Sequence, residues 1–133
     1  MFRKFKISNL YESEGRYLML YTSYFANVKN LPKDYQCFYI SNSNVYGLAK
    51  PLTCVVPSWQ LVKSYKDGFV SSSEYTKIYT DFLDYHKEEI LKQIKALPDN
   101  SVLLCYEKLP KFCHRHVLAE WLRNNGIEIE EYE

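Results

Sequence analysis

The sequence predicts a single α/β domain of three layers, in which a mainly parallel sheet is covered by helices on both faces. Its 133 residues are the size of one ordinary domain. Short apolar runs of strand length alternate with longer segments in which apolar residues recur every three or four positions. The two clearest early strands are apolar on both faces, as strands buried between two layers are. This alternation of strands and helices favours a parallel sheet.

The first half of the chain is predicted to supply two central strands, each a short apolar run bounded by turn residues. Pro51 and Pro57 interrupt the pattern that follows and leave room for only a short helix, ended at Gly68. The predicted elements are a candidate edge strand over 4–8, strands over 16–22 and 36–41 with a loop over 23–32 between them, and a helix over 58–65.

The second half is predicted to contain a long helix and then a strand–helix–strand unit. Ser71 and Glu74 have the spacing of a capping box, in which both side chains accept backbone N–H groups at a helix start. One apolar stripe follows and stops near Leu97. Gly126 stands where a left-handed residue would end the last helix. The predicted elements are a helix from 71 to about 97, a strand over 101–106, a helix from about 112 to 125, and an edge-like strand over 127–130.

Composition and charge exclude several classes of function. The net charge is +1, from 17 basic and 16 acidic residues, which disfavours a general nucleic-acid binder that grips many phosphates. No apolar run is long enough to span a membrane, and none near the N-terminus has signal-peptide length. We therefore expect a cytoplasmic protein with no membrane partner. Its cysteines are then expected to be thiols rather than disulfides; they are Cys37, Cys54, Cys105 and Cys113.

Reactive side chains cluster between residues 105 and 115, where the last central strand runs into the last helix. In open parallel sheets ligands bind beyond the carboxyl ends of strands, where helices begin. No Ser, Thr, Asp or Asn stands between Glu107 and Cys113 to cap this helix, so its first amides are available to an anion. Arg115 would add a planar guanidinium. We predict a site for a phosphate- or carboxylate-bearing small molecule, plausibly a nucleotide, with Cys113 and Arg115 among its ligand-binding residues.

Helix geometry assigns further roles around this site. Cys113 is expected to face the core, His114 to face inward or lie at the rim, and His116 to lie on the solvated face. Cys105, Glu107 and His114 are the candidate catalytic residues. Glu107 and His114 would orient the ligand or transfer protons, and Cys105 with His114 could form a nucleophile–base pair across the loop.

Structural alternatives compete with each of these roles. Arg115 and Glu107 could form an ion pair that ties loop to helix, and Cys105 could simply pack as a small apolar group. A zinc site is disfavoured and no metal ligand is assigned, because Cys-x7-Cys-His lacks short cysteine pairs and adjacent Cys and His side chains diverge on a helix. The whole chain could also be a non-catalytic interaction protein that uses its 13 tyrosines. The sequence does not indicate which cofactor, if any, the protein binds.

The same segment resembles the C-terminal signature of the "domain of unknown function 488" family. The likeness lies in a strand that ends Cys105-Tyr106-Glu107, a loop with Pro110, and Cys113-His114-Arg115 at the start of a helix. This resemblance implies a small bacterial, archaeal or phage α/β domain with no established activity. The family's Thr-x-Gly-like loop after the first strand corresponds to Thr22-Ser23-Tyr24, which lacks the glycine; Thr22 and Ser23 are ligand-binding candidates on that basis. The family's Asp-Val-Arg after the second strand is replaced by Tyr39-Ile40-Ser41.

Overall fold

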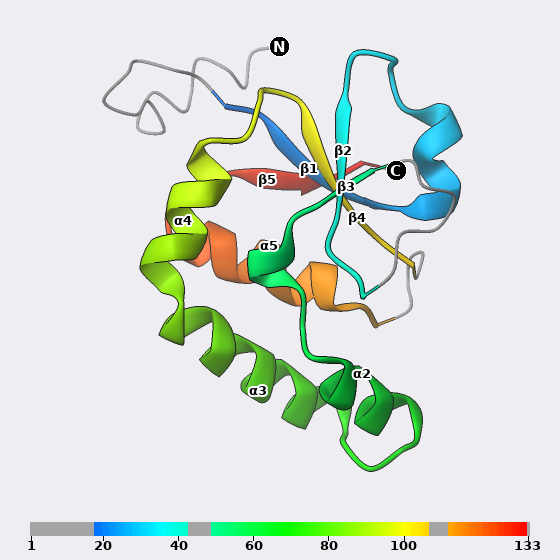
Figure 1. Cartoon of the computed structure of the whole chain (residues 1–133), viewed down its shortest axis with the longest axis vertical. Coiled ribbons are helices and arrows are strands. Elements are labelled where there is room, and N and C mark those ends of the chain that lie inside the picture. The colour runs from blue at the N-terminus through cyan, green and yellow to red at the C-terminus, as the bar shows by residue number, and fades with distance from the viewer. Residues whose placement is uncertain (1–17, 43–48, 107–111, 133) are drawn as a thin grey trace.

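Five parallel strands form one sheet, in the order β3-β2-β4-β1-β5 (Figure 1). The structure is a computed structural model and describes residues 18–42, 49–106 and 112–132. Every strand pair is parallel, so the predicted α/β fold with a parallel sheet is confirmed. The strands are β1 (Leu20–Tyr24), β2 (Gln36–Tyr39), β3 (Lys50–Pro51), β4 (Ser101–Cys105) and β5 (Ile129–Glu131).

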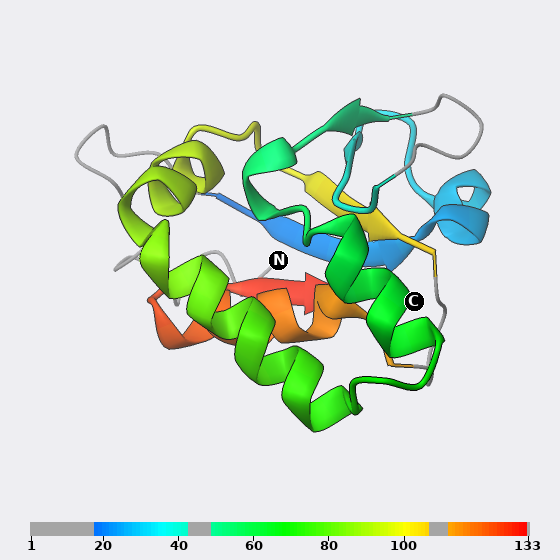
Figure 2. The same cartoon turned by 60° about the horizontal axis from the view of Figure 1, so that its bottom comes forward.

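The α-helices of the described residues pack on one face of this sheet, and a short 3-10 helix packs on the other (Figures 1 and 2). The second helical layer is therefore thinner than the first, and tyrosine rings from β1, β2 and the segment before β2 complete it. The helices are η2 (Phe25–Asn30), η4 (Thr53–Val55), α2 (Trp59–Lys66), α3 (Ser72–Tyr85), α4 (Lys87–Lys95) and α5 (His114–Asn124).

Strand β4 is the centre of the core, and all five of its residues are buried. Side chains alternate across a strand, so Leu103 and Cys105 face the α-helices whereas Val102 and Leu104 face the other layer, where Phe25 of η2 lies. Because β4 is hydrogen-bonded to both β1 and β2, its carboxyl end and theirs meet at one edge of the sheet. That edge is where the sequence analysis expects a ligand.

The predicted long helix is wrong in one respect: it is two helices. At His86 the backbone leaves the helical region, with φ −105° and ψ 22°, and α3 ends there as α4 begins. Tyr79 and Leu83 of α3 and Ile90 of α4 are all fully buried, and the bend lets each helix keep its own apolar stripe on the core. Residues 25–30, predicted as loop, form η2 instead, and this helix buries Phe25 and Asn27.

Both predicted helix ends with a named signal are confirmed. The Ser71–Glu74 capping box is formed in both directions. Gly126 has φ +87°, and its N–H bonds the Arg123 carbonyl while the Ile127 N–H bonds that of Leu122. This is the Schellman pattern, which satisfies carbonyls at a helix end and here sends the chain directly into β5.

Some predictions fall outside the described residues: the edge strand over 4–8, the start of the first strand, Glu107 and Pro110. Among the residues that are described, no helix has both the length and the apolar character needed to cross a membrane.

Replacing Ser71 by alanine should lower the free energy of unfolding by about 1 kcal/mol, because the Glu74 amide loses the Ser71 hydroxyl that accepts its hydrogen bond. Urea denaturation of wild type and variant measures the change. Ser73→Ala, an exposed change within the same helix, is the matched control and should cost less than the cap. Equal losses in the two variants would contradict the assignment of the cap.

Candidate functional site

A pocket of about 170 Å³ lies at the carboxyl ends of β2 and β4. Ser41 and Asn42, directly after β2, form one side of it, and Cys113 and His114 at the start of α5 form another. The pocket therefore lies where the sequence analysis places the ligand, beyond the strand ends and against the first turn of the last helix. Tyr106, which follows β4, also lines it.

Aromatic side chains make up the remaining walls of the pocket. Tyr65 of α2, Tyr75 of α3 and Phe112 form a three-ring cluster with centroids 5.0 to 5.6 Å apart. Trp59 and Lys66 of α2 also line the pocket, and the Trp59 side chain is 55% exposed. The lining thus combines aromatic rings with a basic side chain.

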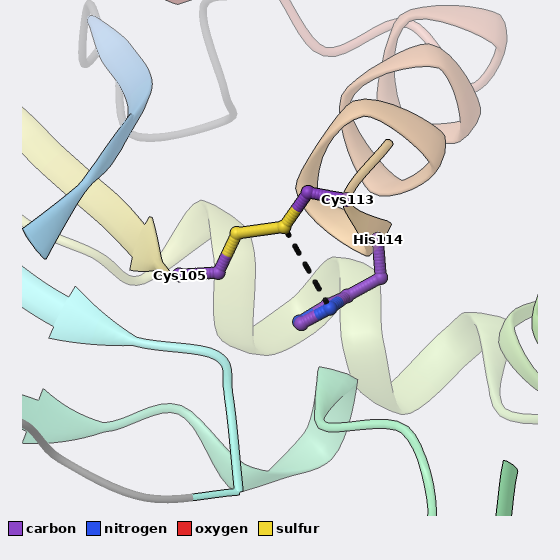
Figure 3. Close-up of side chains that lie close together, drawn as sticks. All are labelled: Cys105, Cys113 and His114. Atoms are coloured by element: carbon purple, nitrogen blue, oxygen red, sulfur yellow. Dashed lines mark hydrogen bonds between the residues drawn. A yellow bond between two sulfur atoms is a disulfide. The ribbon is translucent and has the colours of Figure 1, made fainter. Parts of the chain in front are cut away.

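The structure joins Cys105 and Cys113 in a disulfide, with the sulfurs 2.09 Å apart (Figure 3). The expectation that all four cysteines are thiols is therefore wrong for these two, and it holds for Cys37 and Cys54. That expectation rested on the cellular compartment. It did not take into account that β4 ends at Cys105, beside Cys113 at the start of α5.

Cys113 is the N-cap of α5 and lies outside the helix proper, with φ −151° and ψ 144°. Its side chain therefore does not follow helical spacing, and its sulfur lies 4.0 Å from Nδ1 of His114. The argument that these adjacent side chains diverge on a helix is wrong for this reason. The sulfurs of Cys105 and Cys113 and a ring nitrogen of His114 all lie within 4.8 Å of one another.

His114 is buried and held in one orientation. Its Nε2 lies 2.6 Å from the carbonyl oxygen of Ile40, and since a carbonyl only accepts, Nε2 carries the proton and donates it. Burial lowers the pKa of His114 to about 4, so the ring is neutral near pH 7 and Nδ1 keeps its lone pair. Nδ1 faces the sulfur of Cys113 (Figure 3). The inward position expected for His114 is the one observed.

Arg115 points away from the pocket and is fully buried. Its Nη2 and Nε donate to the two carboxylate oxygens of Glu131 at 2.7 and 3.1 Å, and its Nη1 lies 3.3 Å from the sulfur of Cys105. The guanidinium also lies 5.7 Å from the centre of the Tyr24 ring. An anion bound by Arg115 would have to displace Glu131, so the geometry favours a bracing role for Arg115 with Glu131 as a partner; the alternative pair with Glu107 lies outside the described residues.

Thr22 and Ser23 bond to neighbouring residues of the C-terminal segment, and Thr22 shares its partner with Arg115. The Thr22 hydroxyl donates to Glu131 at 2.7 Å, and the Ser23 hydroxyl donates to the carbonyl of Tyr132 at 3.0 Å. Both are at most 1% exposed. The predicted site residues thus divide into two groups: Cys113 and His114 line the pocket and Cys105 is bonded to Cys113, whereas Thr22 and Arg115 contact Glu131 and Ser23 contacts the neighbouring Tyr132.

His116 differs from its expected place on the solvated face. It is half-buried, and its Nε2 lies 4.0 Å from a carboxylate oxygen of Glu131. Burial, with the neighbouring charge of Arg115, lowers the pKa of His116. Glu131 is not among the residues predicted for the site, because no local pattern links it to Arg115, 16 residues earlier in the chain. The sequence analysis also missed Trp59 and Lys66, whose helix could be predicted but whose position over the pocket depends on tertiary packing.

Comparison with known proteins identifies the family. The model described as "Active DUF488-N3 subclade" matches residues 40–126, which is more than half of the chain. The chain belongs to the domain of unknown function 488 family. The match includes all residues of this family member that line the pocket, and it ends before Glu131.

A curated protein is similar to most of this chain. It is "Elongation factor 4" of Malacoplasma penetrans (strain HF-2), 26% identical over 110 residues. Those residues are 82% of this chain and only 18% of that protein, so the chain spans less than a fifth of it. No solved structure matches at a comparable level of significance.

Replacing Glu131 by alanine should lower the free energy of unfolding by about 3 kcal/mol, because it removes the carboxylate that accepts two hydrogen bonds from the buried Arg115 guanidinium. Thermal or urea denaturation measures the loss. Glu120→Ala removes an exposed partner of Arg123 and should cost less than about 1 kcal/mol. A loss no larger in Glu131→Ala than in Glu120→Ala would show that the pair does not brace the fold.

Acid should destabilise the protein partly through His114. The folded-state pKa of about 4 lies below the usual 6.5, so unfolding takes up a proton between these values, and the stabilisation present above pH 6.5 is lost as pH falls toward 4. When the pH falls from 7 to 4.5, the free energy of unfolding should decrease by about 2 kcal/mol less in His114→Gln than in wild type. Urea denaturation at both pH values measures the difference. An identical pH dependence in the two proteins would contradict the lowered pKa.

Proposed function

We propose that the pocket binds a small anionic molecule that carries a planar ring, of the nucleotide type. The observation that carries the proposal is the lining itself: rings of α2, α3 and Phe112 surround a hollow that also contains Lys66 and His114. Aromatic walls favour a flat ring, and a lysine ammonium favours phosphate or carboxylate.

The size of the pocket limits which part of the ligand it can enclose. A volume of about 170 Å³ is smaller than the roughly 300–1,000 Å³ of sites that enclose a drug-sized molecule. A single ring system fits inside, and the anionic group then lies at the opening, on the side of Lys66. Trp59, more than half exposed, can cover a ring at the same opening.

The start of α5 supports an anion from the opposite side. The Cys113 side chain accepts no hydrogen bond from the first amides of the helix. These N–H groups, with the positive end of the helix dipole, favour a negative group at the wall that Cys113 and His114 form. In this proposal Arg115 acts indirectly, because it fixes the position of Cys105 and of the helix start.

The second candidate function is an interaction protein in which the Cys-His-Arg segment only braces the fold. The sealed Arg115–Glu131 pair favours this role for Arg115 itself. Phe69 and Tyr85, 80% and 85% exposed, are the kind of side chains that contact partners. His114 and Cys113 favour the small-molecule site instead, because they line an open pocket.

Adenosine monophosphate should bind the wild-type protein and raise its melting temperature, whereas inorganic phosphate should bind more weakly because it has no ring. Calorimetry and thermal scanning measure both. Lys66→Met should weaken nucleotide binding by at least about tenfold, the usual effect of losing a charge-assisted hydrogen bond. Lys63→Met is the matched control: Lys63 lies on the same helix, pairs with Asp67 and does not line the pocket.

Absence of binding by every purine and pyrimidine monophosphate tried would refute the nucleotide proposal. An equal effect of Lys66→Met and Lys63→Met would refute the role of Lys66. If nucleotide binding survives both lysine substitutions but is lost in Trp59→Ala, the ring binds in the pocket as proposed. The anionic group then does not bind at Lys66.

A further inference from the structure

Three metal-ligating atoms converge where β4 ends and α5 begins. The sulfurs of Cys105 and Cys113 and a ring nitrogen of His114 lie within 4.8 Å of one another, and all three residues are at most 8% exposed. Figure 3 shows the two cysteine side chains reaching toward each other from the strand and the helix, with the imidazole beside them. Within the described parts of the chain, this is the one group of three such residues that could hold an ion.

The imidazole is oriented as a metal-ligating histidine is. In protein metal sites the second ring nitrogen usually donates to a backbone carbonyl or carboxylate, which fixes the tautomer and the direction of the ring. His114 donates from Nε2 to the Ile40 carbonyl, and so turns the lone pair of Nδ1 toward Cys113. This orientation of the ring depends only on contacts within the protein and not on a ligand in the pocket.

Two features of the surroundings favour thiolates over thiols. Nη1 of Arg115 lies 3.3 Å from the Cys105 sulfur and can donate to it. Cys113 is the N-cap of an eleven-residue helix, and the positive end of a helix dipole favours a thiolate at that position. Each sulfur thus has its own source of positive potential.

The backbone spacing suits an ion held between the two sulfurs. The Cα atoms of Cys105 and Cys113 are 7.5 Å apart, beyond the range of about 4.4–6.8 Å that most disulfides occupy. Two thiolates of one zinc ion lie further from each other than bonded sulfurs do, since each Zn–S bond is about 2.3 Å. After reduction, the backbone positions of the two cysteines therefore already leave room for an ion between their sulfurs.

We propose that, when its disulfide is reduced, this protein binds Zn²⁺ through Cys105, Cys113 and Nδ1 of His114. Reduction by a phosphine or thiol adds two electrons and two protons to the disulfide, and zinc then displaces the two thiol protons. Two soft thiolates and an imidazole select zinc over magnesium or calcium. Three protein ligands are the number found in catalytic zinc sites, and two of them, Cys113 and His114, also line the pocket.

The first test uses the full chain, reduced with a phosphine and freed of reductant without oxygen. Titration against a chromophoric chelator should give one Zn²⁺ per reduced chain, and the oxidised protein should bind none. Cobalt(II) in place of zinc should give the intense charge-transfer absorption that thiolate ligands produce. A folded, reduced wild type that takes up no zinc overturns the proposal, as does cobalt binding without the thiolate absorption.

Variants assign the ligands. Cys113→Ser and His114→Gln should each weaken zinc binding more than about 100-fold, since even outer-shell changes cost about 10–100-fold. The matched control is Cys37→Ser combined with Cys54→Ser, which removes the two free cysteines and should leave affinity unchanged. Zinc binding that is lost in this control and kept in Cys113→Ser overturns the assignment. Circular dichroism of each variant confirms its fold, and the cobalt spectrum of the wild type tests the ligands without any substitution.

Discussion

The buried guanidinium of Arg115 is the interaction on which the rest of the site depends. A positive charge with no exposure to solvent is stable only when its hydrogen bonds are satisfied, and Glu131 supplies two of them. Because Glu131 belongs to β5 and also accepts from Thr22 of β1, one ion pair ties the last helix to two neighbouring strands. The same guanidinium reaches the sulfur of Cys105. The start of α5 is thereby fixed relative to the end of β4, and this sets the distance between the two cysteines.

The fold could be predicted from the sequence because its signals are local and repeated. Apolar runs, the Ser71 capping box and Gly126 each correspond to one element or one end, and the parallel sheet follows from their order. The break at His86 could not be predicted, because the apolar stripe continues through it and only packing against the sheet requires two directions. Strand β3, with two residues, is too short to give a pattern.

The position of a pocket beside Cys113 and His114 could be predicted, but the partners of the candidate residues could not. The rule about strand ends placed the pocket correctly, because it depends only on topology. The role expected of Arg115 assumed that a charged side chain near a ligand site faces the ligand, whereas this one faces a carboxylate 16 residues later in the chain. Cys113 was expected to follow helical spacing, and its N-cap conformation instead brings it to both Cys105 and His114. In each case the missing information was a long-range contact.

The composition of β3 has a consequence for how copies of this protein behave toward one another. Strand β3 forms one margin of the sheet, and it consists of Lys50 and Pro51, both exposed. A proline has no N–H to offer an approaching strand, and a lysine adds charge and bulk at the same place. This margin is therefore a poor template for intermolecular strand addition. The other strands of the sheet are rich in β-forming residues, and the β3 edge protects them against aggregation.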